Sequence, residues 1–209
     1  MKNMSKIITI GRQFGSGGRH LGEMIAQKLG IPIYDKELVE MAAKKSNVSL
    51  EAVKEIDERA SNSLLYSIVT GGWGTKGLNV PLFYEMPLND KLFIAQSKII
   101  KELADEGDCV IVGRCADYVL ADTNHDVLSV FVYAPMDYRI KFAAEKLDIN
   151  QSRAKEKISK TDKQRKTYYD YYTNKTWGDM KSYDLCINVE KSGREKAADM
   201  IIMCMEDMK

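Results

Sequence analysis

The feature that most restricts the fold is a glycine-rich stretch between a β-branched run and an amphipathic segment. The run KIITI, residues 6–10, precedes GRQFGSGGRHLG, residues 11–22, and apolar residues then recur at helical spacing as far as Leu29. This order predicts a buried strand of a parallel sheet, a loop and a helix. The backbone N–H groups of such a loop, together with the positive end of the helix, hold anionic oxygens. The sequence therefore predicts a phosphate-binding loop.

The loop departs from the pattern G-x-x-x-x-G-K-[ST] because it has no lysine. With Gly17 as the second glycine, Gly18 takes the place of the lysine and Arg19 that of the hydroxyl residue. The glycines still let the backbone approach a phosphate, and arginine can bind phosphate through two parallel hydrogen bonds. We therefore expect the loop to hold phosphate. The predicted contacts are Arg12, Gly15, Ser16, Gly17, Gly18, Arg19 and His20.

Two alternatives for the loop remain open. One is a strand-to-helix turn without a ligand. The other is a dinucleotide-binding loop, since Asp35 follows Gly15 by about 20 residues, the spacing expected of a ribose-binding acid. A G-x-G-x-x-G pattern that starts at Gly15 needs glycine at position 20, where the chain has His20. The glycine spacing therefore favours a phosphate loop.

Predicted strands and helices alternate along the rest of the chain. Apolar, β-branched runs predict strands at 31–35, 109–113, 129–134 and 184–189. Helical periodicity predicts helices at 19–29, 36–45, 49–60, 90–106, from 135, at 151–172 and at the C-terminus, with a turn-rich segment at 61–90. We predict one three-layer α/β domain over residues 1–209, with a mostly parallel sheet, a helical insert at 36–106 and a basic lid at 151–180.

Charged residues follow two of the predicted strands. Asp35 ends the strand at 31–35, and Arg114 comes directly after the strand at 109–113. Binding groups collect at the carboxyl edge of open α/β sheets. Arg114 is well placed there to clamp phosphate in a reaction that depends on position and charge. Asp117, three residues further on, would bind a sugar or base, or cap the next turn.

The segment RAKEKISKTDKQRK, residues 153–166, concentrates seven cations with few acids. A solvated helix face is the usual explanation. In a chain with 31 Lys and Arg against 30 Asp and Glu, we favour a lid that closes over phosphates. The aromatic residues at 167–179 also allow binding of single-stranded nucleic acid by stacking, but Asp170 and Asp179 argue against it.

Composition excludes other classes of protein. The balanced charge suggests neither nucleic acid nor an acidic membrane surface as a partner, and no apolar run is long enough to span a membrane. Cys109, Cys115, Cys186 and Cys204 lie far apart, which argues against a zinc site or a disulfide scaffold and favours free thiols. We expect a soluble, cytoplasmic protein. His125 has no partner that suggests a catalytic role.

Five motifs occur in the order seen in one family. These are GRQFGSGGR, YDKEL, VGRCADYVL, the K-x-D-x-x-R run of Lys160, Asp162 and Arg165, and the ending YYDYYT…W…YDL. With them, nearly the whole chain resembles the bacterial cytidylate kinase-like family, a relative of the nucleoside monophosphate kinases. The resemblance implies a P-loop NTPase-like fold, ATP and Mg²⁺ as cofactors, and small-molecule nucleotides as substrates.

The resemblance also implies roles for residues. It makes residues 15–20 the phosphate loop, Asp35 the start of the acceptor-binding region, and Lys160 with Arg165 the basic lid. Arg114 matches the arginine of the G-R-D motif of true cytidylate kinases, but the aspartate that follows there is Cys115 here. This departure puts specificity for cytosine in doubt.

The main hypothesis is ATP-dependent phosphoryl transfer to a nucleoside monophosphate, with CMP as the expected acceptor and Arg114 and Arg19 as catalytic residues. Arg114 and Asp117 would join Asp35 on the acceptor side, and Asp162 would join the lid. The alternative is a non-catalytic nucleotide-binding or regulatory module that lost catalysis with the loop lysine. The residues that would hold a metal and the oligomeric state stay unpredicted.

Overall fold

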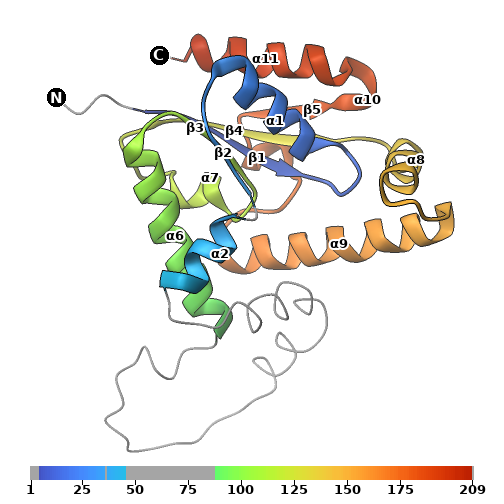
Figure 1. The fold of residues 1–209 in the computed structure, drawn as a ribbon, viewed down its shortest axis with the longest axis horizontal. Helices are drawn as coiled ribbons and strands as arrows, with labels where there is room; N and C mark the ends of the chain where they lie inside the picture. The colour runs from blue at the N-terminus through green and yellow to red at the C-terminus, as the bar shows by residue number, and fades with distance from the viewer. Residues whose placement is uncertain (1–4, 36, 46–87, 209) are drawn as a thin grey trace, which may run out of the picture. The chain divides into compact units, whose positions relative to one another are not determined.

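The computed structural model describes residues 5–35, 37–45 and 88–208. It forms two compact units, Met1–Asp35 with Ile100–Lys209, and Lys36–Ile99. The first unit contains the sheet and the glycine loop (Figure 1). In the second unit, α2 (Glu37–Lys45) and the first part of α6 (Leu88–Glu106) are described. The predicted helix at 49–60 and nearly all of the turn-rich segment at 61–90 lie outside the described residues.

The described strands form one five-stranded sheet in which every pair of neighbours is parallel, in the order β2-β3-β1-β4-β5. They are β1 (Lys6–Arg12), β2 (Ile33–Tyr34), β3 (Cys109–Val112), β4 (Asp126–Tyr133) and β5 (Leu185–Asn188). The central register places Ile8 opposite both Val110 and Leu128. Because all strands run the same way, their carboxyl ends meet at one edge of the sheet. The predicted parallel α/β fold is thereby confirmed.

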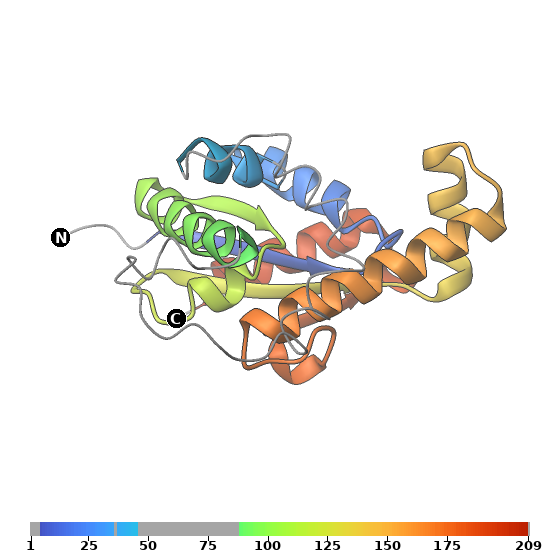
Figure 2. The same ribbon diagram turned by 90° about the horizontal axis from the view of Figure 1, so that it is seen from below.

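Helices cover both faces of the sheet in the first unit (Figure 1). α1 (Gly18–Leu29) and α11 (Arg194–Glu206) lie side by side on one face. α7 (Ala116–Val119) and α9 (Gln151–Tyr172) lie on the other, and α8 (Met136–Leu147) packs against α9 (Figure 2). The short elements η1 (Met180–Ser182) and α10 (Val189–Ser192) flank β5. The arrangement is the predicted three-layer fold.

The core lies between the sheet and the α1–α11 layer. β1 has apolar side chains on both faces because both are covered: Ile7, Ile8 and Ile10 are at most 1% exposed. Ile25 of α1 and Ile201 of α11 are fully buried against this sheet. Burial of each such side chain contributes about 1.5–3 kcal/mol. This packing fixes the strand and the helix that flank the glycine loop.

Some sequence expectations differ from the structure. Pro135 is the N-cap of α8 and not its first residue. Leu147 at the end of α8 is exposed although it is apolar, whereas Arg139 on the same helix is buried. Two of the cysteines, Cys109 and Cys115, are buried, and all four are free thiols. None of the described helices is long and apolar enough to cross a membrane.

Candidate phosphate-binding site

The glycine loop turns through two left-handed residues. Gly15 has φ 79° and Gly17 has φ 83°, a conformation that residues with a Cβ rarely adopt. Between them, the backbone amide and hydroxyl of Ser16 both donate to the carbonyl of Gln13, at 3.4 and 2.9 Å. These bonds close a tight turn directly after β1. The glycines predicted from the sequence are therefore required by the backbone of the loop.

The amides at the start of α1 are available to a ligand. The first hydrogen bond of the helix runs from the amide of Leu21 to the carbonyl of Gly17, at 2.9 Å. The amides of Gly18, Arg19 and His20 precede it, and no acceptor among the described residues takes them. Such amides, with the positive end of the helix, attract anions. The main-chain cradle predicted from the sequence is present.

Position 18, which takes the place of the loop lysine, has no room for a side chain. A Cβ on Gly18 would lie 2.6 Å from the Cβ of Arg12 and 3.2 Å from the Cβ of Val132. Real Cβ atoms essentially never approach others so closely. The side chain of Arg12 thus occupies the space in which a side chain at position 18 would begin. The closest contact is with the Cβ of position 12, so any residue other than glycine at position 12 would crowd a side chain at position 18.

Asp35, at the end of β2, joins two of the predicted phosphate contacts. Its Oδ1 lies 3.1 Å from Nη2 of Arg12, and its Oδ2 lies 3.6 Å from Nε of Arg19. Arg19 also donates from Nε to Glu23, at 3.0 Å. Asp35 is buried, whereas Arg19 is exposed. The carboxylate therefore offsets part of the charge of both arginines beside the loop.

The residues after β3 adopt a rare backbone conformation. Gly113, Arg114 and Cys115 have φ values of 77°, 57° and 54°. The left-handed conformation costs residues with a Cβ roughly 1–2 kcal/mol each. The amide of Gly113 donates to the carbonyl of Ile10 at 3.0 Å, which ties this turn to β1. Strain of this kind is common where a side chain is held for binding or catalysis.

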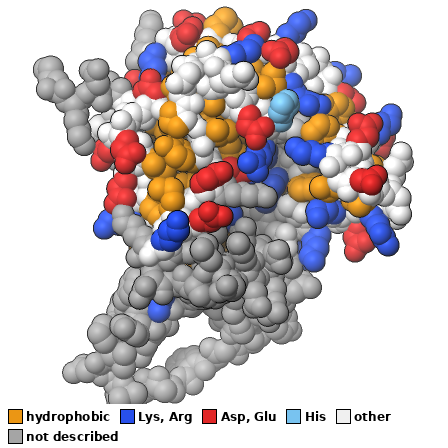
Figure 3. Space-filling model, viewed as in Figure 1, with side chains coloured by type: hydrophobic (Ala, Val, Ile, Leu, Met, Phe, Trp, Pro, Cys, Tyr) orange, Lys and Arg blue, Asp and Glu red, His pale blue; other side chains and the backbone are white. Residues whose placement is uncertain are grey.

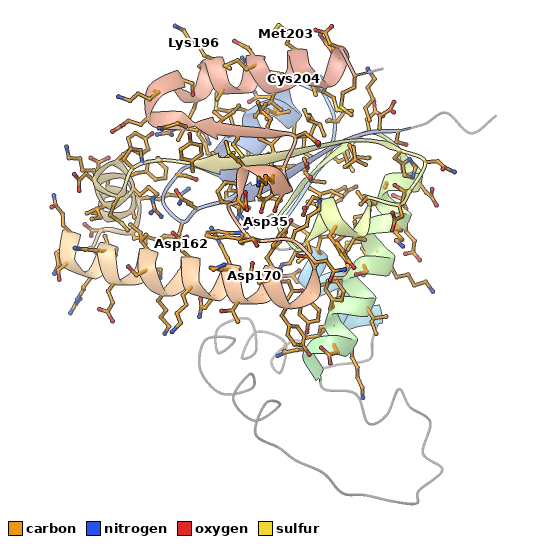
Figure 4. All side chains as sticks on the ribbon, turned by 180° about the vertical axis from the view of Figure 1, so that it is seen from behind. Asp35, Asp162, Asp170, Lys196, Met203 and Cys204 are labelled. Atoms are coloured by element: carbon orange, nitrogen blue, oxygen red, sulfur yellow. The ribbon has the colours of Figure 1, made fainter. Side chains whose placement is uncertain are left out.

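Arg165 of α9 completes a group of cations at this edge of the sheet. Its Nη1 donates to the carbonyl of Arg12 at 2.9 Å. Burial and the charges of Arg12 and Arg114 lower the pKa of Arg165, which is about 9 although Asp162 and Asp35 act in the opposite sense. Figure 4 shows Asp35 and Asp162 between the sheet and α9. Arg165 of α9 thus lies within electrostatic range of Arg12 at the end of β1 and of Arg114 after β3.

A buried ion pair fastens the loop to α8 and α9. The carboxylate of Asp162 accepts from the amide of Phe14 at 2.7 Å and from Nη1 of Arg139 at 2.5 Å. The same Nη1 donates to the carbonyl of Phe14 at 3.3 Å. Arg139 is 5% exposed, and its Nε has no hydrogen-bond partner among the described residues. Asp162, predicted as part of a lid, therefore holds the phosphate loop in this structure.

Asp117 is enclosed behind Arg114. Its carboxylate accepts from the hydroxyl of Tyr169 at 2.6 Å and lies 3.7 Å from Nζ of Lys175. Burial raises its pKa, and the hydrogen bond from Tyr169 partly opposes this effect. Asp117 lies in the first turn of α7, whose N-cap is Cys115. In this arrangement the carboxylate joins α7 to the C-terminal part of α9, and its role in acceptor binding stays a prediction.

Other predicted residues lie at the surface. Lys160 is exposed on α9, and His20 is exposed with its Nδ1 3.4 Å from Glu23. Lys and Arg side chains gather on the side of the molecule where α1, α8 and α9 approach one another (Figure 3). In the described part of the chain, no group of three His, Cys, Asp or Glu side chains could hold a metal ion.

Sequence analysis missed two arginines that contact the loop. Arg139 lies in α8, where the pattern of polar residues did not predict that its side chain would be buried. Arg194 begins α11, and a Cβ on Gly17 would lie 3.4 Å from its Nε. The only sequence signal for Arg194 is its position directly after Gly193, where the chain enters the last helix. Neither residue belongs to a motif, because each is brought to the loop by packing of distant helices.

A parallel five-stranded sheet with a glycine loop between β1 and α1 defines a three-layer P-loop fold. The model of the cytidylate kinase-like family matches residues 7–191. The chain belongs to this family. A search of curated proteins finds no significant match.

Solved structures agree on the fold. An uncharacterized protein from Eubacterium ventriosum ATCC 27560 is 29% identical with a TM-score of 0.70, over 97% of this chain and 99% of that one. Shikimate kinase from Bacteroides thetaiotaomicron is 12% identical with a TM-score of 0.53, over 96% and 98%. A gluconokinase from Sinorhizobium meliloti 1021 is 13% identical with a TM-score of 0.54, over 98% and 95%. At such low identity the two kinases are evidence for the fold alone.

Proposed function

We propose that the protein transfers the γ-phosphoryl group of ATP to a nucleoside monophosphate, with CMP as the first acceptor to test. Membership of a kinase-like family and the P-loop fold support nucleotide-dependent phosphoryl transfer in general. The observation that carries the proposal is the group formed by Arg12, Arg114 and Arg165 beside a loop whose amides are available. Three partly desolvated cations at one site favour an anion of high charge.

Each element has a separate task in the proposed reaction. The amides of Gly18, Arg19 and His20 hold donor phosphates, and the side chain of Arg19 adds charge at the exposed rim. Arg114 lies between donor and acceptor and stabilises the charge of the transferring group, with Arg165 beside it. Phosphoryl transfer depends mostly on position and charge, so no protein nucleophile is needed.

Magnesium is proposed to arrive with the nucleotide. Mg²⁺ is usually held by one or two carboxylates together with substrate phosphates, and it would supply neutralisation of phosphate charge. The described residues do not form a cluster that fits the ion by itself. We therefore derive no step from the metal. The arginines are the cations whose positions support the proposal.

The test is an acceptor panel with ATP and Mg²⁺. CMP, UMP, AMP, dCMP and small alcohols are offered, and ADP formation is followed for wild type, Arg114→Ala and Lys101→Gln. Lys101 is an exposed cation of α6, away from the residues proposed for the site, and serves as the charge-matched control. We expect Arg114→Ala to lower kcat/KM about 100-fold or more, and the control to stay within twofold. Turnover of Arg114→Ala within threefold of wild type would contradict the role of Arg114.

A second candidate is a nucleotide-binding module without catalysis. It is favoured by the steric exclusion of any side chain at position 18 and by the pairing of Asp35 with two loop arginines. Loss of a positioned cation costs more in the transition state than in ground-state binding. Such a module would show thermal stabilisation by nucleotides but form no ADP with any acceptor of the panel.

A further inference from the structure

Arg194 lies against the phosphate loop in a fixed position. A Cβ on Gly17 would lie 3.4 Å from its Nε, 3.5 Å from its Cδ and 3.8 Å from its Cζ. The guanidinium carbon lies 4.6 Å from the centre of the Phe142 ring, and Nη2 donates to the hydroxyl of Tyr138 at 3.3 Å. The rings of Tyr138 and Phe142 are parallel to within 6°. Two aromatic residues of α8 thus hold this cation beside the glycine.

The charge of Arg194 is not offset by an acid in the described part of the chain. No carboxylate there forms an ion pair with it. The two nearby acids of α11, Glu195 and Asp199, instead pair with Lys28 of α1, at 3.0 and 2.6 Å. Arg12 and Arg19 differ in this respect, because both interact with Asp35. The charge of Arg194 beside the loop is therefore available to an anion.

The loop cannot supply a cation from the usual position. A side chain at position 18 would collide with the Cβ of Arg12, as described above. A cation that takes the place of that lysine, in addition to Arg19 at the rim, would then come from another element. Arg194 reaches the loop from the N-terminus of α11, where its backbone adds no negative charge. Its stacking on Phe142 leaves the edges of the guanidinium to donate hydrogen bonds, the geometry in which arginine binds phosphate.

We infer that Arg194 is a binding residue for the polyphosphate of the donor nucleotide and supplies the positive charge that a lysine provides in other P-loops. The inference rests on the proposed function for the identity of the ligand as a nucleoside triphosphate. It goes beyond that proposal in assigning the donor-side charge to a residue of the last helix. The ligand chemistry is that of a linear polyphosphate, for which inorganic tripolyphosphate is the simplest probe.

The experiment measures binding and needs no turnover. Titration calorimetry at fixed, low salt compares tripolyphosphate, ATP and adenosine on the full-length wild type and on Arg194→Gln, Arg194→Lys and Lys196→Gln. Lys196 lies two residues further along α11 and is exposed (Figure 4). Lys196→Gln removes the same charge as Arg194→Gln, so it is the matched control. Thermal unfolding of each variant checks the fold. Arg194→Lys keeps the charge and gives a second variant if the glutamine variant does not fold.

We expect Arg194→Gln to weaken the binding of tripolyphosphate and of ATP at least tenfold. The affinity of Arg194→Lys should lie between those of Arg194→Gln and wild type, and that of Lys196→Gln should stay within twofold of wild type. An effect of Arg194→Gln below threefold on tripolyphosphate overturns the inference. An equal loss of affinity for adenosine also overturns the inference, because it would mean that Arg194 binds the nucleoside and not the phosphates. Wild type that binds no tripolyphosphate overturns it as well. If the arginine effect on tripolyphosphate is present but no acceptor is phosphorylated, the inference holds and the proposed kinase function fails.

Discussion

The carboxylate of Asp162 accepts a hydrogen bond from the backbone amide of Phe14 at 2.7 Å, although the two residues are 148 positions apart. The bond joins the middle of α9 to the start of the phosphate loop, and the ion pair of Asp162 with Arg139 adds α8 to the same junction. The basic helix is thus fastened to the loop through Asp162, its one half-buried acid. Any closing motion of the segment at 151–180 has to start from this attachment.

Substitution of Asp162 tests this junction. Removal of one partner of a buried ion pair destabilises a protein by about 3–5 kcal/mol. We expect Asp162→Ala to lower the free energy of unfolding by about 3 kcal/mol, because Arg139 stays buried without its partner and the amide of Phe14 loses its acceptor. Asp162→Asn retains an acceptor for that amide, so its free energy of unfolding should fall by a smaller amount. Urea denaturation at pH 7 measures the difference.

The control for this substitution is an exposed ion pair on the same helix. Lys166 pairs with Asp170 four residues away, and exposed pairs of this kind contribute about 0.3–0.5 kcal/mol. Lys166→Gln should therefore change the stability by less than about 0.5 kcal/mol. If Asp162→Ala were no more destabilising than Lys166→Gln, the junction would not hold the loop.

Reintroduction of the missing lysine should fail. A Cβ at position 18 would lie 2.6 Å from the Cβ of Arg12, and overpacking of this kind costs about 1–3 kcal/mol. We expect Gly18→Lys and Gly18→Ala to be destabilised by similar amounts, and Gly18→Lys not to gain activity. Thermal unfolding and the ADP assay provide the readouts. A Gly18→Lys protein with wild-type stability and higher kcat would show that the loop tolerates the lysine.

The backbone strain at Arg114 should lower the stability of the protein, while its side chain should be needed for the proposed activity. Because its φ is 57°, glycine fits this backbone better than alanine, and we expect Arg114→Gly to be more stable than Arg114→Ala by about 1 kcal/mol. Both substitutions remove the guanidinium, so any interaction of the side chain cancels in the comparison. Both variants should lose the proposed activity equally. Equal melting temperatures for the two variants would show that position 114 is not strained.

The buried carboxyl of Asp117 should make stability depend on pH. Its folded pKa lies above the ordinary value of 3.8, so the contribution of this group is fully present below about pH 3.8 and is lost as the pH rises through the folded pKa. Asp117→Asn removes this dependence. The stability of wild type relative to Asp117→Asn should therefore fall between pH 4 and pH 8, as measured by urea denaturation.

The exposed Asp122 supplies the control for this pH profile. Asp122→Asn should follow the wild-type curve at every pH. A constant difference between wild type and Asp117→Asn over the range would mean that Asp117 titrates alike in the folded and unfolded states.

Local sequence patterns predicted most of the fold. The β-branched run at 6–10 and the apolar runs at 109–113 and 129–134 became adjacent parallel strands, because residues of that kind are stable when buried on both faces of a sheet. The glycines at 15 and 17 predicted the loop, since their left-handed backbone is a local requirement. The order of the sheet was not predicted, because it depends on pairings between distant residues, such as Lys6 of β1 with Asp126 of β4.

The site was predicted only in part, for a physical reason. Arg12 was predicted from the glycine-rich stretch, and Arg114 because it follows a strand, since the carboxyl ends of parallel strands share one edge. The burial of Arg139 and the position of Arg194 beside Gly17 arise from helices packed against the sheet and against each other. Such contacts have no period or motif in the sequence.

The sequence by itself determined that this chain forms a strand, a glycine loop and a helix, because those features depend on neighbouring residues. Only the tertiary structure decided which cations surround the loop and that no side chain fits at position 18. Both outcomes depend on how residues far apart in the chain share a small volume, and that is settled when the layers pack.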